Sequence, residues 1–421
     1  MSEVRGEAQA LGAISGTVAV IGVSGEDLSD EARELLRDAA LVAGGERHLR
    51  ELSVEPERSV ALKGDLSEAL ARIESESGPV AVLASGDPGF FGIVRLLAGR
   101  LGPERLRVLP APSSVALAFG RVGLHWEDAV VVSVHGDPEE RSPRRAVNVC
   151  RAHPKVCVLT SPAFGPAELA RELRGLGREV AVLERLGTPE ERVFRGDAEG
   201  IAARDWHDPN VVLVLDPERR SGGKSWVSGA VRPGGRWGLP GDEFRHRSGM
   251  ITAPEVRSVV LSKLGPGLGD LVWDVGAGSG SVAVECARFG AAAVAVERDA
   301  EVCGHVRENA HRHGVYVTVV EGAAPAALEG LPEPDAVFVG GSGRDFEAVV
   351  RACAGRARRS VVMTLITLER VVPAARLLER AGFAVETKLV QVASVEPIAD
   401  LNRLVPGNPV FVVSGERKER S

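Results

Sequence analysis

Short runs of apolar, often β-branched residues alternate with amphipathic segments along most of the chain. In the first half these runs lie at residues 17–23, 80–85, 129–135, 155–161 and 210–215. Between them lie helical patterns, such as residues 28–42, with Ser29 as a predicted N-cap and acidic residues in the first turn. This alternation is typical of parallel sheets covered by helices, so we predict an α/β fold.

The alternation stops and restarts near the middle of the chain. Residues 217–244 are rich in Gly, Pro, Ser and Arg and show no sustained period. Beyond them, strands are predicted at 271–277, 293–298, 317–322, 336–341 and 360–365, with 387–395 and 408–415 as a closing antiparallel pair. We therefore predict a flexible N-terminus over 1–15, a first domain over 16–217, a linker over 218–237 and a second domain over 238–416.

Length, charge and cysteine content fit this picture. A chain of 421 residues is too long for one ordinary core. The formal charge of −7 disfavours a nucleic-acid partner. No apolar run reaches the roughly 18 residues that span a bilayer, and the N-terminus lacks the basic start of a signal peptide, so we expect a cytoplasmic protein with no membrane partner. The cysteines show no CxxC spacing, which predicts plain thiols and no metal site; they are Cys150, Cys157, Cys286, Cys303 and Cys353.

A glycine-rich turn in the second half points to a bound cofactor. Gly276, Gly278 and Gly280 lie between a predicted strand and a helix, where backbone N–H groups and the helix N-terminus can face a ligand without Cβ interference. Glu297 ends the next strand, about 20 residues on, where a carboxylate can bind two ribose hydroxyls. A glycine turn without a ligand is the alternative.

Three details favour S-adenosylmethionine over a dinucleotide. Ser281 stands where the dinucleotide pattern has Gly or Ala. Asp274 ends the strand, where we expect its carboxylate to face the pocket and to suit a cationic ligand. The predicted antiparallel ending of the domain is typical of class I methyltransferases.

The segment from Gly238 to Gly415 resembles the CbiT family, which methylates a corrin precursor. The motifs that carry the resemblance are LPGDEF, ITAPEVRSVVLSKL, VWDVGAGSGSVAVECA, VERD, VVEGAAPAAL, VFVGGSG and NPVFVVSG. It implies a Rossmann-like class I domain whose cofactor-binding residues are Thr252, Asp274, Gly276, Ala277, Gly278, Gly280, Glu297, Arg298, Gly322, Ala323, Gly340 and Gly341. Ser342 is assigned to the substrate. Ala323 stands where the family usually has Asp, and Ala253 and Pro254 replace usual basic residues.

The first half carries a second set of motifs. LASGDPGFFG at 83–92 follows an apolar strand and contains a predicted tight turn; LPAPSSVALA at 109–118 feeds a helix; IGVSGEDLS opens the domain. With GGERHL, VSVHG and LERLGTPEERV, these resemble the tetrapyrrole (class III) methyltransferases, and specifically the CbiE family. That family has two α/β subdomains around S-adenosylmethionine. The implied cofactor contacts are Ser85, Gly86, Asp87, Ser113, Ser114, Thr160 and Ser161. Ser24 replaces a usual proline, and Asp137 a common arginine.

Other polar residues have two interpretations. His48 and His135 could be catalytic bases, but a structural histidine with a satisfied ring is the favoured interpretation of each. Four arginines lie in segments that the resemblance places around the second cleft, and we expect them to bind substrate carboxylates: Arg245, Arg247, Arg344 and Arg403. A solvated surface position is the alternative, and Arg344, directly after the glycine loop at 340–343, is the strongest candidate.

Two such families in one chain imply an enzyme with one S-adenosylmethionine site per domain. The resemblance implies methylation of a tetrapyrrole at carbon 5 by the first domain, and methylation at carbon 15 with loss of an acetate carboxyl by the second. Either a metal-free or a cobalt-containing substrate fits these expectations. It also implies a homo-oligomer, plausibly a tetramer formed through the second domain. Two rivals stay open: a tRNA adenine methyltransferase, which a basic groove would favour, and a tetrapyrrole carrier, which would need degenerate cofactor loops.

Overall fold

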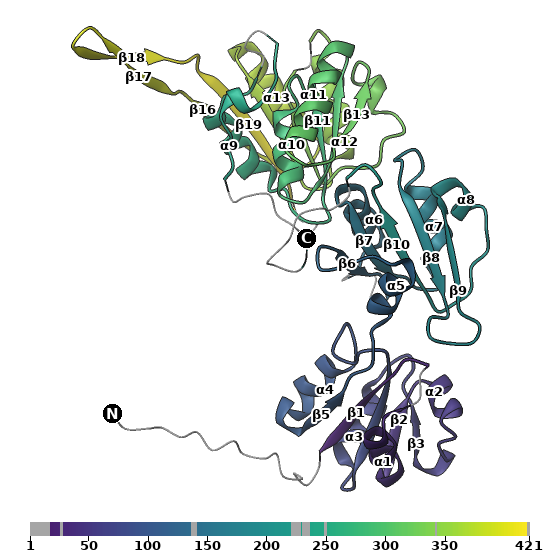
Figure 1. Ribbon diagram of the computed structural model, residues 1–421. Helices are drawn as coiled ribbons and strands as arrows, with labels where there is room; N and C mark the ends of the chain where they lie inside the picture. The colour runs from purple at the N-terminus through teal and green to yellow at the C-terminus, as the bar shows by residue number, and fades with distance from the viewer. Residues whose placement is uncertain are drawn as a thin grey trace. The chain divides into compact units, whose positions relative to one another are not determined.

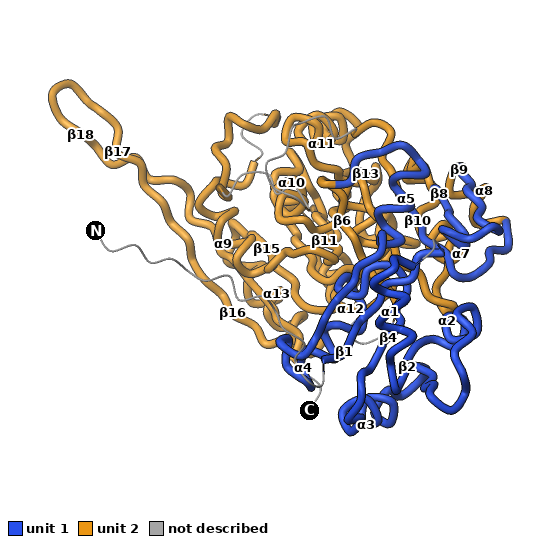
Figure 2. The backbone as a smooth tube through the Cα atoms, turned by 60° about the horizontal axis from the view of Figure 1, so that its bottom comes forward, with its two compact units in different colours: residues 1–126, 181–196, 204–213 blue, residues 127–180, 197–203, 214–421 orange. Residues whose placement is uncertain are grey.

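The computed structural model describes residues 17–25, 28–135, 141–219, 229, 236–247, 251–341 and 343–418. The sequence predictions for residues 1–15, for Asp137 and Ser342 and for most of the linker at 218–237 lie outside these residues. Helices and strands alternate along the chain (Figure 1). The chain forms two compact units, the first from residues within 1–126, 181–196 and 204–213, and the second from residues within 127–180, 197–203 and 214–421 (Figure 2).

The first sheet is parallel throughout. Its strand order is β3 (Ser59–Ala61), β2 (Leu41–Gly44), β4 (Val80–Ser85), β1 (Val18–Val23) and β5 (Leu106–Leu109). The helices of this region are α1 (Asp30–Asp38), α2 (Glu46–Glu51), α3 (Ser67–Ser75), α4 (Val94–Leu101) and α5 (Ser114–Val122). Valines, leucines and alanines of β1, β2 and β4 are buried against them.

The first predicted helix is partly wrong. Ser29 does cap α1, because its Oγ accepts a hydrogen bond from the Ala32 N–H at 3.2 Å. The helix ends at Asp38 rather than continuing to residue 42. Ala39 is extended, and Leu41 and Val42 are fully buried in β2, where they pair with β4. Burial in a sheet therefore outweighs the local helical pattern.

A second five-stranded sheet has the order β6 (Val130–Ser133), β7 (Lys155–Leu159), β10 (Asn210–Leu215), β8 (Glu179–Glu184) and β9 (Arg192–Asp197). Its helices are α6 (Pro143–Ala152), α7 (Pro166–Glu172) and α8 (Ala198–Ala202). The sequence predicted β6, β7 and β10 but not β8 or β9. The edge strand β9 alternates partly buried and exposed residues, so it lacks the continuous apolar run of a central parallel strand.

The third sheet has seven strands, in the order β13 (Thr318–Glu321), β12 (Ala292–Glu297), β11 (Leu271–Val275), β14 (Ala336–Val339), β15 (Ser360–Leu365), β19 (Val410–Arg417) and β16 (Phe383–Val390). The first five are parallel, and β19 is antiparallel to both its neighbours. The helices are α9 (Pro254–Leu264), α10 (Ser281–Arg288), α11 (Ala300–Arg312), α12 (Phe346–Arg356) and α13 (Leu368–Arg380). The mostly parallel α/β sheets with an antiparallel ending confirm the predicted fold class.

An exposed hairpin extends from this sheet and was not predicted. Strands β17 (Ala393–Ile398) and β18 (Leu401–Pro406) pair only with each other, and nearly all their residues are exposed. We call residues 393–406 the arm; in Figure 1 it projects away from the helices around β16 and β19. The predicted strand at 387–395 is therefore two strands, since Leu389 still pairs with β19 whereas Val395 belongs to the arm.

Helix α6 packs against the amino-terminal edge of the third sheet within the second unit. Arg144 donates two hydrogen bonds to Asp335, at 2.8 and 2.7 Å, and Asp335 also accepts the Leu271 N–H at the start of β11. Nearby, the buried Asn148 amide donates to the Gly269 carbonyl at 3.1 Å. Burial by itself would raise the pKa of Asp335, but the hydrogen bonds from Arg144 and Leu271 outweigh it and lower that pKa. The third sheet is thus fastened to a helix from the first half of the sequence.

Three general properties complete the fold. No helix in the described part of the chain is long and apolar enough to cross a membrane. All five cysteines are free and buried, and burial raises the pKa of the Cys150 thiol to about 12. Among the described residues, no cluster of His, Cys, Asp and Glu side chains is arranged to hold a metal ion.

The contact between Arg144 and Asp335 yields a stability prediction. Arg144→Ala leaves a buried carboxylate with only its backbone partner, so we expect the free energy of unfolding of the second unit to fall by about 1–3 kcal/mol. Urea denaturation followed by fluorescence of buried tryptophans such as Trp273 measures this. The control is Arg351→Ala, because Arg351 pairs with Glu347 at 3.5 Å with both side chains more than half exposed, and its loss should cost less than about 0.5 kcal/mol. Equal effects of the two variants would contradict the prediction.

Candidate functional site

The glycine loop after β11 lies against the loop after β14. Gly276 has a φ of 70°, and a Cβ on it would lie 2.2 Å from the Gly341 carbonyl oxygen. A Cβ on Gly280 would lie 2.6 Å from the Val306 side chain. Glycine is therefore required at 276 for backbone to approach backbone, and at 280, where φ is 71°, for the loop to pass the Val306 side chain. The loop leads into α10, where the Ser281 N–H donates to the Ser279 Oγ at 3.4 Å.

Asp274 lies beneath this loop rather than beside an open pocket. Its side chain is only 1% exposed, and one carboxylate oxygen accepts the Ala283 N–H at 2.9 Å, in the first turn of α10. The other oxygen, Oδ1, is buried without a hydrogen-bond partner among the described residues. Burial raises the pKa of Asp274 to about 7, and the nearby charge of Glu297 adds to this. The expectation that the carboxylate faces the pocket is therefore corrected: Asp274 ties the strand end to α10.

Glu297 ends β12 beside the glycine loop, as predicted. Its Oε2 accepts the Gly278 N–H at 3.0 Å, and its Oε1 accepts the N–H groups of Arg298 and Asp299 at 2.8 and 3.2 Å. The side chain is half-buried, and Arg298 beside it is exposed. Gly322 lies close by, since its N–H donates to the Glu297 carbonyl at 2.9 Å. A carboxylate at this edge is available to a ligand that approaches from the solvent side.

The segment before α9 is fastened to this site by buried polar groups. Arg257 is fully buried, and its guanidinium donates to the Glu285 carboxylate and to the Thr252 carbonyl, both at 2.6 Å. Asn309 on α11 exchanges two hydrogen bonds with the Arg245 backbone and donates a third to the Ser279 carbonyl. The Thr252 carbonyl is thereby tied to α9, and the role of Thr252 in binding the cofactor stays a prediction.

Sequence reasoning missed Arg257 and Asn309. The signal for Arg257 was a charged residue among Val256, Val259 and Val260, which is unusual unless the charge is paired. Asn309 gave no signal, because a single asparagine on an amphipathic helix is ordinary.

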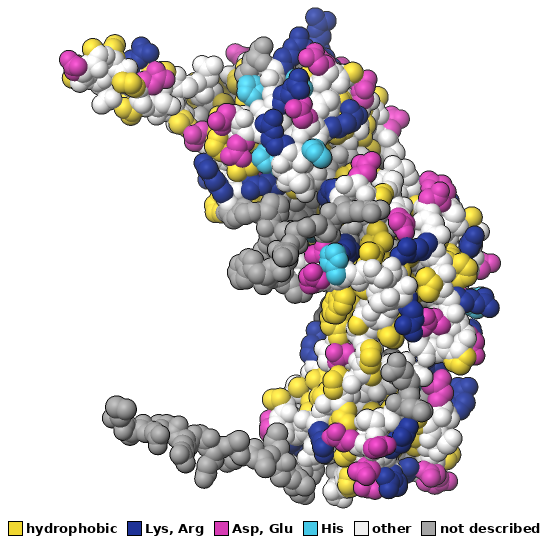
Figure 3. Space-filling view, in the orientation of Figure 1, with side chains coloured by type: hydrophobic (Ala, Val, Ile, Leu, Met, Phe, Trp, Pro, Cys, Tyr) yellow, Lys and Arg dark blue, Asp and Glu magenta, His cyan; other side chains and the backbone are white. Residues whose placement is uncertain are grey.

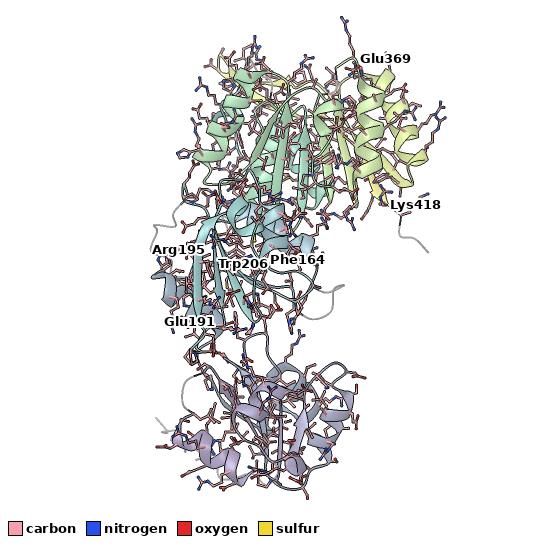
Figure 4. All side chains as sticks on the ribbon, turned by 90° about the vertical axis from the view of Figure 1, so that its right-hand side faces the viewer. Phe164, Glu191, Arg195, Trp206, Glu369 and Lys418 are labelled. Atoms are coloured by element: carbon pink, nitrogen blue, oxygen red, sulfur yellow. The ribbon has the colours of Figure 1, made fainter. Side chains whose placement is uncertain are left out.

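An open depression lies past the loop at 340–343. Its volume is about 560 Å³, and it is lined by Arg344, Asp345, Phe346, Glu347, Ala348, Glu369, Arg370 and Pro373. Glu369, labelled in Figure 4, stands at the start of α13. Arg370, which the sequence analysis missed, donates to the Gly343 carbonyl at 2.8 Å and stacks on Phe346. Three carboxylates and two guanidinium groups share the lining, so Arg344 does not lie in a purely basic pocket.

The other predicted substrate arginines are paired with acidic residues in this structure. Arg245 contacts Glu308 at 2.6 Å, and Arg247 contacts Asp299 at 3.2 Å, in exposed pairs near the glycine loop. Arg403 lies on the arm, where it faces Glu396 at 3.4 Å. The structure therefore does not bring Arg403 together with the other three. Exposed pairs of this kind are weak, so carboxylates of a ligand can compete for the arginines.

The first half holds a second cluster of close backbone loops. A Cβ on Gly22, at the end of β1, would lie 2.3 Å from the Gly86 carbonyl oxygen and 2.5 Å from the Ala111 nitrogen. The predicted tight turn is confirmed, with Gly86 at a φ of 63° and the Gly89 N–H donating to the Asp87 carboxylate at 2.8 Å. The carboxyl ends of β1, β4 and β5 thus meet at one edge, where a ligand can contact backbone directly.

Ser113 caps α5, because its Oγ accepts the Ala116 N–H at 3.1 Å, and Ser114 begins that helix. Thr160 and Ser161 follow β7 in the second unit; Ser161 pairs with Phe164, which Figure 4 labels.

His48 is buried, as the favoured interpretation expected, but its ring is not fully satisfied. Its Nε2 lies 2.8 Å from the Ser85 Oγ, while its Nδ1 has no hydrogen-bond partner among the described residues. The nearest acidic group is Glu51, with Oε2 at 3.5 Å from Nδ1. His135 is exposed and follows β6.

Comparisons with known proteins match both halves. Residues 17–202 match the family of Tetrapyrrole (Corrin/Porphyrin) Methylases, and residues 242–417 match the Precorrin methyltransferase domain. A Sinorhizobium protein named "Precorrin-6Y C(5,15)-methyltransferase [decarboxylating]" is 36% identical over 94% of this chain and 95% of its own length. A "Cobalt-precorrin-7 C(5)-methyltransferase" of Salmonella typhimurium is 32% identical over 48% of this chain and 98% of its own. A Pyrobaculum calidifontis protein named "Probable cobalt-precorrin-6B C(15)-methyltransferase (decarboxylating)" is 34% identical over 42% of this chain and 94% of its own length.

A solved structure of a "Precorrin-6y C5,15-methyltransferase" from Geobacter metallireducens is 34% identical, covers 43% of this chain and 97% of its own, and has a TM-score of 0.41.

The chain has a glycine-lined edge on each of two α/β sheets, and both halves match methyltransferase families. It is therefore an S-adenosylmethionine-dependent C-methyltransferase. Within that class, the chain belongs to the family of precorrin-6Y C(5,15)-methyltransferases (decarboxylating), since it aligns with the Sinorhizobium member over nearly the full length of both.

The raised pKa of Asp274 gives a pH-dependent prediction. The folded chain holds this proton up to about pH 7, whereas an unfolded aspartate loses it near pH 4, so folding stability falls as the pH rises between these values. Asp274→Asn removes that loss. We expect the stability of the parent relative to the variant to fall by on the order of 2–4 kcal/mol between pH 4 and pH 8. Urea unfolding at several pH values measures the difference, and parallel curves for parent and variant would contradict a raised pKa.

Proposed function

We propose that the chain methylates precorrin-6Y (precorrin-6B) at carbons 5 and 15, with decarboxylation of the ring C acetate, to give precorrin-8X in cobalamin biosynthesis. The match of 36% over the full length of a relative named for both methylations carries this proposal. The two half-length relatives support a division of labour, because one is named for carbon 5 and the other for carbon 15 with decarboxylation.

We propose one S-adenosylmethionine site in each half, over the domain bounds 16–217 and 238–416. The matched ranges 17–202 and 242–417 support these bounds. In the second half the cofactor-binding residues would be those of the glycine loop with Glu297, Arg298, Thr252 and the 340–341 loop. In the first half they would be Ser85, Gly86, Asp87, Ser113 and Ser114 of the first unit, while the roles of Thr160 and Ser161, in the second unit, stay predictions from the resemblance. Each edge is built where two loops meet through their backbones, since a Cβ on Gly276 or Gly22 would strike the neighbouring loop, and this leaves main-chain groups at the edge for a ligand.

The cofactor supplies an activated methyl group, so the chain's own task is alignment. The glycine edges allow the donor to lie against backbone, and the acid at Glu297 fixes the ribose through hydrogen bonds. The exposed arginines of the second half would orient the carboxylates of the macrocycle, and Arg245, Arg247 and Arg344 are the proposed residues. Arg403 lies on the arm, so we propose that it binds a substrate carboxylate only if the arm contacts the substrate. The predicted cytoplasmic location stays a prediction.

The direct test is to count methyl groups. The parental chain, incubated with the reduced precursor and labelled cofactor, should add two methyl groups and release one carbon dioxide per ring, measured by mass spectrometry. Glu297→Ala removes hydrogen bonds to the ribose worth roughly 1.5–3 kcal/mol each and should weaken the second cofactor site at least about tenfold, so methylation with decarboxylation slows at limiting cofactor. A parental chain that adds no methyl group would refute the proposed activity. Full decarboxylation by Glu297→Ala at limiting cofactor would show that the second cofactor site does not include Glu297.

We also propose that the chain forms a homo-oligomer, a tetramer, through its second domain, and the arm supports this. Val395, Ile398, Leu401 and Leu404 on it are 49–74% exposed, and Figure 3 shows apolar side chains along the hairpin. A two-stranded hairpin is marginally stable in water on its own, and exposed apolar strands invite pairing with another chain. A second copy of the arm offers the same surface, as symmetric interfaces require.

Light scattering tests the oligomer. The parental chain should have a mass well above that of the 44.4 kDa monomer, and Leu401→Glu with Leu404→Glu should return it to the monomer mass. The control Leu96→Glu changes an exposed leucine of α4 in the first unit and should leave the mass unchanged. A monomeric parent would refute oligomerisation, and an unchanged mass of the double variant would place the interface elsewhere.

A further inference from the structure

In the first half, Ser85, His48 and Glu51 lie in a line that ends at the candidate cofactor edge. The Ser85 Oγ and His48 Nε2 are 2.8 Å apart, and the Glu51 Oε2 is 3.5 Å from Nδ1 on the other side of the ring. Ser85 is exposed at the end of β4, whereas His48 is only 4% exposed. An accessible hydroxyl is thus backed by a buried imidazole, which is in turn backed by a carboxylate.

The proposed reaction needs a place for a proton. When carbon 5 of the ring gains a methyl group, the new C–C bond forms as the S–C bond breaks, and the hydrogen on that carbon must leave as a proton to restore conjugation. Among the residues assigned above to the first half, Asp87 is the one with an ionisable side chain. Asp87 is engaged with the Gly89 N–H, and the remaining polar groups are hydroxyls.

We propose that Ser85, His48 and Glu51 form a proton relay that takes up the proton released at carbon 5; this inference rests on the proposed methylation by the first half. The ring proton passes to the Ser85 Oγ as the Ser85 hydroxyl proton passes to His48 Nε2. The imidazolium forms beside Glu51 and returns its proton to solvent after product leaves. Ser85 is the catalytic residue of the relay, and His48 and Glu51 act through it.

The surroundings of His48 suit this role. A carboxylate near Nδ1 favours the tautomer with the proton on Nδ1, which leaves Nε2 free to accept from Ser85. Burial lowers the pKa of His48, as does the charge of Arg47, while Glu51 raises it, so the ring is neutral and able to accept a proton at neutral pH. The strands β2, β3 and β4, which pack on α2, contain no ionisable side chain, so Arg47 and Glu51 are the charged groups that act on the ring.

Three substitutions in the full-length chain test the relay. His48→Gln and Ser85→Ala should each lower kcat for methylation at carbon 5 by about 10²-fold, the usual contribution of a general base. In His48→Gln, cofactor affinity measured by calorimetry should stay within twofold of the parent, and in both variants methylation with decarboxylation at carbon 15 should do the same. The control is His311→Gln, which makes the same change at an exposed histidine of α11 and should alter neither reaction.

The pH profile separates a relay from a merely structural contact. Parental kcat at carbon 5 should rise with pH along a limb set by His48. Glu51→Gln removes the group that raises the pKa of His48, so that limb should shift to lower pH, and the His48 imidazole resonance in an NMR titration of the cofactor-free chain should shift with it. If His48→Gln fails to fold, Ser85→Ala and Glu51→Gln decide.

If kcat at carbon 5 is unchanged in Ser85→Ala, or if the pH limb of Glu51→Gln coincides with that of the parent, the relay is refuted while the proposed function stands. A parental chain that adds no methyl group at carbon 5 overturns the proposed function, and the relay with it.

Discussion

Two loops of the third sheet touch through their backbones, and the second site depends on that contact. Gly276 after β11 and Gly341 after β14 lie so close that no side chain fits between them. Parallel pairing of β11 with both β12 and β14 brings Glu297, the glycine loop and the 340–343 loop to one edge. Below that edge, the buried carboxylate of Asp274 ties the strand to α10, and Arg257 with Asn309 holds the segment that carries Thr252. The surface offered to a ligand is mostly main chain, supported by buried polar side chains.

The sequence predicted most of this edge because each of its parts leaves a local trace. Glycines at 276, 278 and 280, an acid about 20 residues later and continuous apolar strands all follow from spacing and burial alone. The short β2 and the half-exposed β9 escaped, since their patterns are those of a helix end and a loop. The buried apolar run of β8 was missed although its pattern is that of a central parallel strand. The arm was not predicted either, because in the sequence its first apolar residues continue the pattern of β16. The strand pairing in the structure shows that they form a separate strand.

Side-chain partnerships were the part that spacing could not supply. The sequence placed Asp274 beside a pocket, but a carboxylate can turn inward as readily as outward, and the first turn of α10 offered it a donor. Arg245, Arg247 and Arg403 were predicted to meet a substrate, yet each first meets an acidic neighbour separated in sequence by between 7 and 63 residues. His48 shows the converse: burial was expected, but its approach to Ser85, 37 residues away, depends on α2 packing over β4.

The contact of α6 with the third sheet has a consequence for how such a chain can change over generations. The Asp335 carboxylate accepts hydrogen bonds from the Arg144 guanidinium and from the first N–H of β11. Asn148 donates to the Gly269 carbonyl, in the turn just before that strand. A substitution on either side alone leaves a buried charge or an orphaned carbonyl, so tolerated changes must arise in matched pairs across the junction. The two halves of this chain must therefore change together, and a half taken from a distant relative would lack the residues that match Arg144 and Asn148 or Asp335 on the other half.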